Sequence, residues 1–210
     1  MNGEGYFTLK SAAEARFTER KSEFIGNASP VKTEREALDF INSVRSKYSD
    51  ATHNVYAYIL RDGNLARFSD DGEPHGTAGL PTMDVLRKEG LCDCAVVVTR
   101  YFGGILLGAG GLVRAYTAGA KAAVDAAVKI RMKPFDIMEF RLDYSRYSRA
   151  AQLMSVHRVY VTDSNFAEDV YIKCRAPQDR AAAFAESLRE ATNASVELHV
   201  CGVEYDYEED

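Results

Sequence analysis

The sequence predicts an α+β protein with two domains. Segments whose apolar residues recur at helical spacing are interspersed with short apolar strands. Lys133-Pro134 interrupts the helical pattern and marks the expected boundary between a domain at residues 1–133 and another at residues 134–210. The 210 residues, 46% of them hydrophobic, are sufficient for two small domains with their own cores.

The first expected domain contains, in chain order, a helix, a hairpin, a second helix, a buried strand and a long helix, at residues 33–48, 53–69, 81–88, 95–99 and 111–128. Thr33 and Glu36 have the spacing of a capping box, in which both side chains satisfy free amides at a helix start. Leu112, Tyr116 and Ala120 belong to the apolar face of the long helix.

The second expected domain has the order of a ferredoxin-like fold. Its elements are a strand, a helix, a hairpin of two strands, a helix and a strand, at residues 137–144, 147–157, 159–162, 169–173, 181–191 and 195–203. The hairpin turn is expected at Asp163-Ser164-Asn165, because these residue types favour turns. The order βαββαβ is that of the ferredoxin-like class.

Composition excludes several classes of protein. No apolar run approaches the roughly 18 residues that a membrane span needs, and the N-terminus lacks the pattern of a signal peptide, so a cytoplasmic protein is expected. The four cysteines, Cys92, Cys94, Cys174 and Cys201, lack the spacing of a zinc site and are expected to be free thiols.

Charge is unevenly distributed along the chain. Through Lys133 there are 18 Lys and Arg against 16 Asp and Glu, and from Pro134 onward there are 8 against 15. Phosphate neutralisation supplies most of nonspecific affinity for nucleic acid. Only the first domain can therefore offer a basic face, and only if its cations cluster in space.

An acidic turn follows the expected hairpin. Asp70, Asp71 and Glu73 lie within four residues of one another. Such carboxylates repel one another unless they are solvated, hydrogen-bonded or bound to a cation. Capping of backbone amides is one reading and a Mg²⁺ site is the other, and we assign no metal. Together with His53 and Thr77 these residues form a candidate polar site.

A glycine-rich segment joins the buried strand to the long helix. Its glycines can bring free amides close to an anion at the helix start, although tight packing also demands glycine. Basic residues on either side favour the anion reading. The candidate anion or nucleic-acid site comprises Lys21, Arg67, Arg100, Gly103, Gly104, Gly108, Gly110, Gly111, Arg114 and Lys121.

Known catalytic motifs are absent from the sequence. There is no Walker loop, dinucleotide fingerprint, Gly-x-Ser-x-Gly elbow or metalloprotease helix. No residue is identifiable as a nucleophile, so the catalytic residues stay unknown. No cofactor is indicated, and an enzyme is less favoured than a binding protein.

Several of these motifs together resemble the IMPACT/YigZ family. The resemblance rests on motifs in the family's order over about 125 residues, namely Lys21-Ser22-x-Phe24-Ile25, Ala51-Thr52-His53, Asp70-Asp71-Gly72-Glu73-Pro74, Gly76-Thr77-Ala78-Gly79 and the run from Arg100-Tyr101-Phe102-Gly103-Gly104 to Arg114-Ala115-Tyr116. One departure is His75, where many members carry Ser, which weakens any catalytic role for that imidazole.

The resemblance implies a left-handed βαβ crossover in the first domain, as in a ribosomal protein and elongation factor G domain IV. It implies a second domain like elongation factor G domain V. Eukaryotic relatives regulate translation with the help of an additional RWD domain, which this chain lacks.

Besides an adaptor that binds another protein through the acidic second domain, two functional hypotheses follow. The first is a translation-associated regulatory protein that binds RNA, the ribosome or a translation factor through the first domain. The alternative is an enzyme or sensor for a small phosphorylated ligand, which would use the glycine-rich segment and the Asp70/Asp71/Glu73 cluster. If the cations and polar residues converge in a cleft, a small ligand is favoured, whereas a broad basic face favours RNA.

Overall fold

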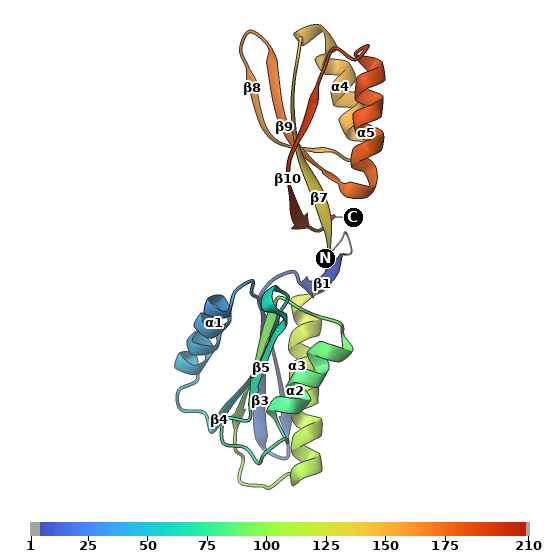
Figure 1. Cartoon of the computed structure of the whole chain (residues 1–210). Helices are drawn as coiled ribbons and strands as arrows, with labels where there is room; N and C mark the ends of the chain where they lie inside the picture. Colours follow the sequence, from blue (N-terminus) through green and yellow to red (C-terminus); the bar gives the residue numbers. More distant parts are fainter. Residues whose placement is uncertain (1–4, 209–210) are drawn as a thin grey trace. The chain divides into compact units, whose positions relative to one another are not determined.

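The computed structural model describes residues 5–208 and divides the chain into two compact units (Figure 1). The N-terminal unit comprises residues 6–131, and the C-terminal unit begins at residue 132. This division lies two residues before the one expected from the sequence. The first four and last two residues of the expected domains lie outside the described residues.

The N-terminal unit contains one five-stranded antiparallel sheet in the order β2-β3-β6-β4-β5. Its elements are β1 (Tyr6–Leu9), β2 (Ala13–Glu19), β3 (Ser22–Pro30), α1 (Glu34–Lys47), β4 (His53–Leu60), the 3₁₀ turn η1 (Asp62–Asn64), β5 (Leu65–Ser69), α2 (Gly79–Lys88), β6 (Cys94–Tyr101) and α3 (Ala109–Ala127). Because β3 and β4 both pair antiparallel with β6, they run parallel to each other, and α1 makes the crossover between them.

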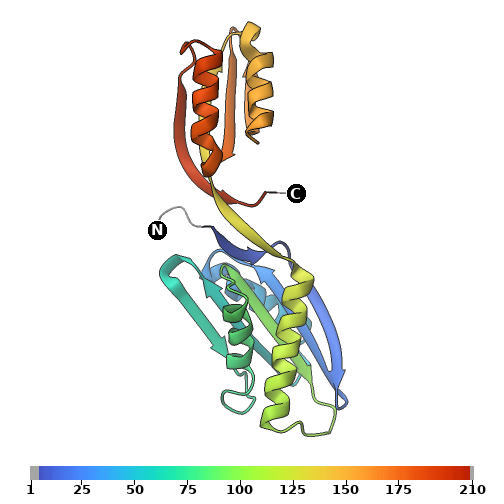
Figure 2. The ribbon, with the colours of Figure 1, turned by 90° about the vertical axis from the view of Figure 1, so that its right-hand side faces the viewer.

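Helices cover both faces of this sheet. Helices α2 and α3 pack side by side on one face, over a core that includes Leu86, Val96 and Tyr116 (Figure 2). Helix α1 covers the other face through a core that includes Ile41 and Val97. Adjacent β6 residues therefore contribute to opposite cores, which explains why this strand is a continuous apolar run rather than an alternating one.

The capping box at α1 forms with one change. Thr33 Oγ1 accepts from the Glu36 amide at 3.2 Å, as expected. The Glu36 carboxylate accepts from the Lys32 amide at 2.7 Å rather than from the Thr33 amide. Two free donors near the helix start are still satisfied.

The C-terminal unit has the ferredoxin-like arrangement. Its elements are β7 (Lys129–Leu142), which begins in the N-terminal unit, α4 (Tyr144–Val156), β8 (Tyr160–Phe166), β9 (Val170–Pro177), α5 (Gln178–Ala191) and β10 (Leu198–Asp206). The strands pair antiparallel in the order β10-β7-β9-β8. Met138, Phe140, Met154 and Phe184 belong to the core between this sheet and its helices.

Two local expectations were wrong. The Lys133-Pro134 break lies inside β7, where Pro134 pairs with Tyr205, so the expected linker is continuous strand. The β8–β9 turn lies at residues 167–169, because a bulge between Val161 and Asp163 lets β8 continue through the turn-favouring residues. Tertiary pairing outweighs local turn propensity at both places.

We predict that a fragment of residues 132–210 folds by itself, because all buried residues of its core lie within it. Dispersed amide signals in an NMR spectrum and a cooperative thermal transition are the expected results. As a control, Phe184→Ala should destabilise the fragment by about 3–5 kcal/mol, since this ring is fully buried. A collapsed spectrum for the unmodified fragment would show that the unit depends on the rest of the chain.

Candidate functional site

Asp70 organises the start of α2. Its carboxylate accepts from the backbone amides of Gly76, Ala78 and Gly79 at 2.9, 3.1 and 2.7 Å. Burial would raise the pKa of Asp70, but these three hydrogen bonds outweigh burial and lower it. The helix has no side-chain cap of its own, so Asp70 supplies one from eight residues upstream of Ala78. It also allows α2 to begin at Gly79, two residues earlier than the sequence predicts.

Asp71 ties the same loop to β4 and α1. Its Oδ2 accepts from the Asn54 amide at 2.6 Å, and its Oδ1 accepts from Arg45 Nη2 at 2.7 Å. The Asp71 carbonyl accepts from His53 Nδ1 at 2.8 Å. Since a carbonyl can only accept, Nδ1 carries the proton and Nε2 of a neutral His53 is left without one.

Glu73 is the buried acid of the loop, with its side chain 3% exposed. Its Oε1 accepts from Arg100 Nη1 at 2.7 Å and from the Tyr116 hydroxyl at 2.8 Å, and lies 3.9 Å from His53 Nε2. Burial, followed by the Glu73 charge, raises the pKa of Tyr116, so this hydroxyl stays protonated and donates.

The three carboxylates of the acidic turn therefore face different partners. Asp70 caps α2, and Asp71 anchors the loop to β4. Glu73 accepts from Arg100 of β6 and from Tyr116 of α3. No cluster of three or more His, Cys, Asp or Glu side chains is arranged to hold a metal ion within residues 5–208. The contacts of Asp70 are with backbone amides, as in the amide-capping interpretation of the acidic turn.

Arg100 is held in the centre of the unit by β6. Its side chain is 6% exposed, and its guanidinium carbon lies 5.6 Å from the Phe24 ring centre and 5.3 Å from that of Phe102. Besides Glu73, it donates to Ser22 Oγ over a long 3.4 Å. Within the described part of the chain, the buried Nε–H has no acceptor. An unsatisfied buried donor of this kind is rare in proteins.

The first glycines of the loop after β6 serve packing. A Cβ at Gly103 would lie 2.0 Å from the Lys21 carbonyl oxygen, so no larger residue fits there. Lys21 therefore meets this loop through its backbone, and its side chain is exposed. Gly104 and Gly108 have φ of 84° and 71°, a conformation that favours glycine.

Helix α3 begins at Ala109 without a side-chain cap and without an acidic residue in its first turn. The first intrahelical bond runs from the Leu112 amide to the Gly108 carbonyl at 2.9 Å. The amides of the preceding turn, including those of Gly110 and Gly111, have no intrahelical acceptor. A 19-residue helix also places partial positive charge at this end.

A pocket of about 380 Å³ unites these features. Its polar wall is formed by His53, Glu73 and Arg100, and its rim by Gly108 and Ala109 at the start of α3. The remaining lining residues are Thr52, Gly72, Pro74, Phe102, Leu106, Leu107 and Leu112. Sites for small molecules typically occupy about 300–1,000 Å³.

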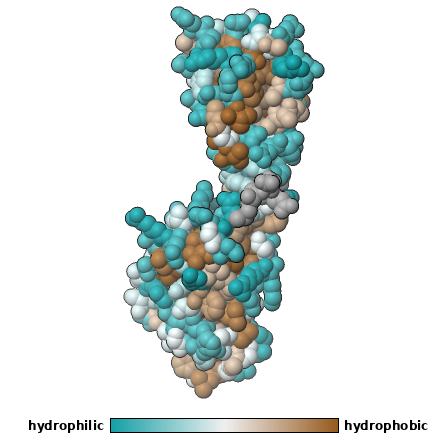
Figure 3. All heavy atoms as spheres, viewed as in Figure 1, coloured by the Kyte–Doolittle hydropathy of each residue, from teal (hydrophilic) through white to brown (hydrophobic). Residues whose placement is uncertain are grey.

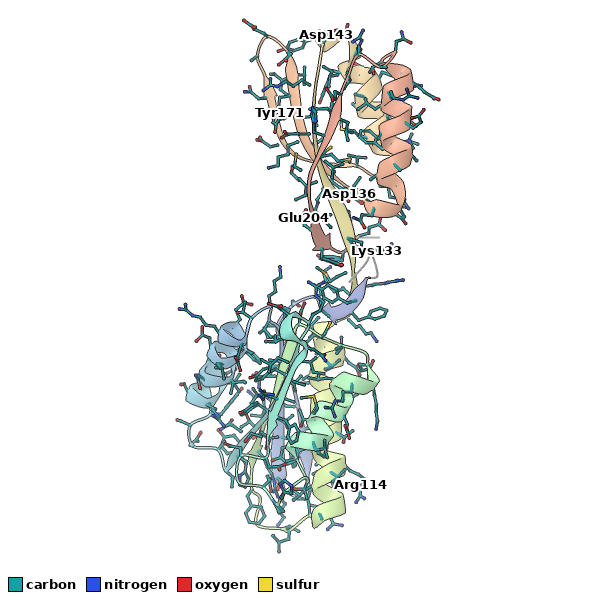
Figure 4. All side chains as sticks on the ribbon, viewed as in Figure 1. Arg114, Lys133, Asp136, Asp143, Tyr171 and Glu204 are labelled. Atoms are coloured by element: carbon teal, nitrogen blue, oxygen red, sulfur yellow. The ribbon has the colours of Figure 1, made fainter. Side chains whose placement is uncertain are left out.

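The other candidate cations lie elsewhere. Arg114 projects from α3 (Figure 4) and lines a separate hollow with Phe17 and Arg20. Lys121 pairs with Asp125 and lies 3.4 Å from Glu89. Exposed Arg67 donates to the neighbouring Ala66 carbonyl. These side chains do not join Arg100 in one basic face.

Thr77 has a structural contact. Its buried hydroxyl donates to the Pro74 carbonyl at 2.7 Å and closes the turn before α2. His75 is fully exposed and lies 3.7 Å from Asp70.

Sequence reasoning missed two members of the site. Tyr116 is expected only as an apolar helix residue, although a buried tyrosine hydroxyl generally requires a partner. Ser22 accepts from the Gly103 amide at 3.2 Å as well as from Arg100. The requirement for a buried partner could have flagged Tyr116. Both Ser22 and Tyr116 belong to the motifs that resemble the family, but the sequence assigned neither a role.

The structure thus defines a two-unit α+β protein with a small-molecule-sized pocket built around a buried ion pair. No helix among the described residues has the length and apolar character to cross a membrane. The Impact N-terminal domain matches residues 20–124, and a domain of unknown function, DUF1949, matches residues 140–195. The chain belongs to the IMPACT family.

Named relatives extend over nearly the whole chain. The IMPACT family member YvyE of Bacillus subtilis is 36% identical over 194 residues, covering 92% of this chain and 89% of its own. The IMPACT family member YigZ of Escherichia coli is 32% identical, covering 85% and 89%. A crystal structure of a hypothetical protein superposes with a TM-score of 0.61 at 29% identity, over 95% of this chain and 98% of that one.

We predict that Asp70→Ala destabilises the N-terminal unit by about 1–2 kcal/mol, the usual effect of losing a helix cap. Because the folded-state pKa of Asp70 is lowered, the stabilisation by its charge is present above its unfolded pKa and is lost as pH falls through the folded value. Thermal unfolding measured from neutral to acid pH checks both statements.

Asp84→Ala is the matched control, because this half-exposed aspartate on α2 lies 3.9 Å from Arg87 and does not cap the helix start. Equal losses of stability in the two variants at neutral pH would show that Asp70 does not cap the helix.

Proposed function

We propose that this protein is a translation-associated regulatory protein whose N-terminal unit binds a phosphate-bearing ligand in the pocket beside Arg100. The translation setting rests on the family, and RNA, the ribosome or a translation factor is the expected partner there. The proposal that the ligand carries a phosphate rests on the geometry of the pocket.

One observation supports the phosphate above all others. Arg100, whose side chain is 6% exposed, lines the same pocket as the uncapped start of α3, and within residues 5–208 its buried Nε–H has no acceptor. An anion at this position gains free helix amides and the favourable end of the helix dipole. Strand β6 supplies the guanidinium and the glycine-rich segment supplies the helix amides, and the two kinds of donor together support the phosphate proposal.

Glu73 limits how strongly an anion can bind. Its charge offsets that of Arg100, so the pocket contains no excess of fixed positive charge from this pair. Hydrogen bonds involving a charged partner contribute about 1.5–3 kcal/mol each, and a helix N-terminus about 0.3–2 kcal/mol. After the entropy cost of association, a lone phosphate should bind with a dissociation constant on the order of 0.1–1 mM.

The position of the other cations argues against a long RNA footprint. Arg114 and Lys121 lie outside the pocket, and Lys121 is already paired. If RNA is the partner, the pocket would therefore engage one phosphate rather than a tract. The logarithm of the affinity should then fall with the logarithm of salt concentration with a slope of about −1 or shallower.

An enzyme for a small phosphorylated ligand is the second candidate, and His53 favours it. The Nδ1 hydrogen bond to Asp71 leaves Nε2 in the pocket wall as a potential proton acceptor. A general base must lie within reach of the proton that it removes. His53→Gln should abolish turnover of any substrate found, while leaving phosphate binding measurable.

The phosphate proposal is tested by changing Ala109, an exposed pocket residue in the first turn of α3. Ala109→Glu and Ala109→Gln have nearly equal size and differ in charge. The glutamate stabilises a helix start but repels an anion there. We expect Ala109→Glu to weaken binding of inorganic phosphate roughly tenfold relative to Ala109→Gln, with an unchanged or raised melting temperature.

NMR titration with inorganic phosphate provides the measurement, read at the amides of Gly108 to Gly111. Saturable shifts that disappear selectively in Ala109→Glu support the proposal. Equal behaviour of the two variants, or shifts that never saturate, would show that the pocket is not a phosphate site. Arg100→Ala is a poor test, since it leaves Glu73 buried and unpaired.

A further inference from the structure

A polar phosphate site does not explain the apolar side of the same pocket. Three large apolar residues after β6 are exposed: Phe102 by 45%, Ile105 by 41% and Leu106 by 81%. Phe102 and Leu106 line the pocket directly. Apolar side chains also lie at the lower end of the N-terminal unit in the view of Figure 3, where the loop between β6 and α3 lies in Figure 1. A grouped exposed apolar surface often marks a binding site.

Phe102 has a backbone hydrogen bond and a ring contact beside the pocket. Its amide donates to Thr52 Oγ1 at 3.0 Å, and its ring covers the Arg100 guanidinium at 5.3 Å. With nearly half of the residue still exposed, the ring can offer contact area to a ligand in the pocket. Flat aromatic groups bind well to such a platform, since stacking of one base contributes about 1–3 kcal/mol.

The pocket therefore combines anion donors with an aromatic wall in a space of about 380 Å³. That volume lies at the small end of the range for compact ligands and suits one nucleotide-sized group rather than a polymer segment. Leu107 and Leu112 extend the apolar lining beneath the rim. A ligand that carries a phosphate at one end and a flat ring at the other can use both the anion donors and the apolar lining.

We propose that the pocket binds a single nucleotide 5′-phosphate, either free or at the end of an RNA strand. The phosphate lies at the start of α3 beside Arg100, and the base packs on Phe102 and Leu106. This inference rests on the proposed phosphate site and adds the ligand class, which the phosphate chemistry alone does not specify.

The experiment compares AMP, ribose 5-phosphate, inorganic phosphate and adenosine by NMR titration of the whole protein. AMP should bind at least fivefold more tightly than ribose 5-phosphate, as the lower limit of base stacking implies. A trinucleotide with and without a 5′-phosphate distinguishes the RNA end from the free nucleotide. Tighter binding of the 5′-phosphorylated strand than of AMP assigns the site to RNA ends, and the reverse assigns it to free nucleotides.

Phe102→Leu keeps an apolar side chain but removes the flat ring. It should reduce the preference for AMP over ribose 5-phosphate to less than twofold while inorganic phosphate still binds. Phe68→Leu is the matched control, because Phe68 is 41% exposed on β5 and does not line the pocket. The control should keep the full preference.

The two proposals fail in different ways. If AMP and ribose 5-phosphate bind equally while phosphate binds, the nucleotide inference is wrong and the phosphate site stands. If no phosphate compound binds, both are wrong. If adenosine binds as tightly as AMP, the phosphate group contributes nothing to binding in this pocket. The proposal that the ligand is a nucleotide 5′-phosphate would then be wrong. A preference for AMP that survives Phe102→Leu would also overturn the assignment of the base to this ring.

Discussion

The buried contact between Arg100 and Glu73 connects most parts of the N-terminal unit. Arg100 belongs to the central strand β6, Glu73 to the loop before α2, and Tyr116, the second donor to Glu73, to α3. Two ions removed from water cost several kcal/mol, and their attraction offsets that cost only when the remaining donors and acceptors are satisfied. Glu73 accepts from Arg100 and Tyr116, whereas the buried Nε–H of Arg100 has no acceptor among the residues that the structure describes. Arg100 and Glu73 also line the pocket, so the same ion pair belongs to both the core of the unit and the pocket wall.

The surrounding loop is shaped to hold Glu73 in place. Asp70 fixes the start of α2, and Asp71 fixes the loop against β4 and Arg45. The acidic turn thus acts as three separate anchors, since each carboxylate satisfies donors in a different direction. Like charges close together in sequence are tolerated here because their partners separate them in space.

The loop after β6 combines packing with an open helix end. Gly103 is confined by the Lys21 carbonyl, so part of the glycine content has a steric cause independent of any ligand. Gly108 and Ala109 instead lie at the pocket rim, where α3 begins without a cap. Buried donors and a helix start with free amides usually lower stability unless something binds them. Their position beside the exposed ring of Phe102 supports the proposed ligand site.

The sequence by itself determined the α+β class, the ferredoxin-like order of the second unit, the position of most elements and the two segments that build the pocket. Periodicity and capping residues report on local structure, so they located α1 and α3 to within a few residues. Local signals failed at Pro134 and at Asp163, where strand pairing overrode turn propensity. Only the tertiary structure decided which of the candidate cations lines the pocket. Arg100 lines it together with His53 and Glu73. Arg114 lines a separate hollow, and Lys121 pairs with Asp125. Direction and burial of a side chain depend on residues distant in the chain, and that long-range packing is not encoded in any local pattern.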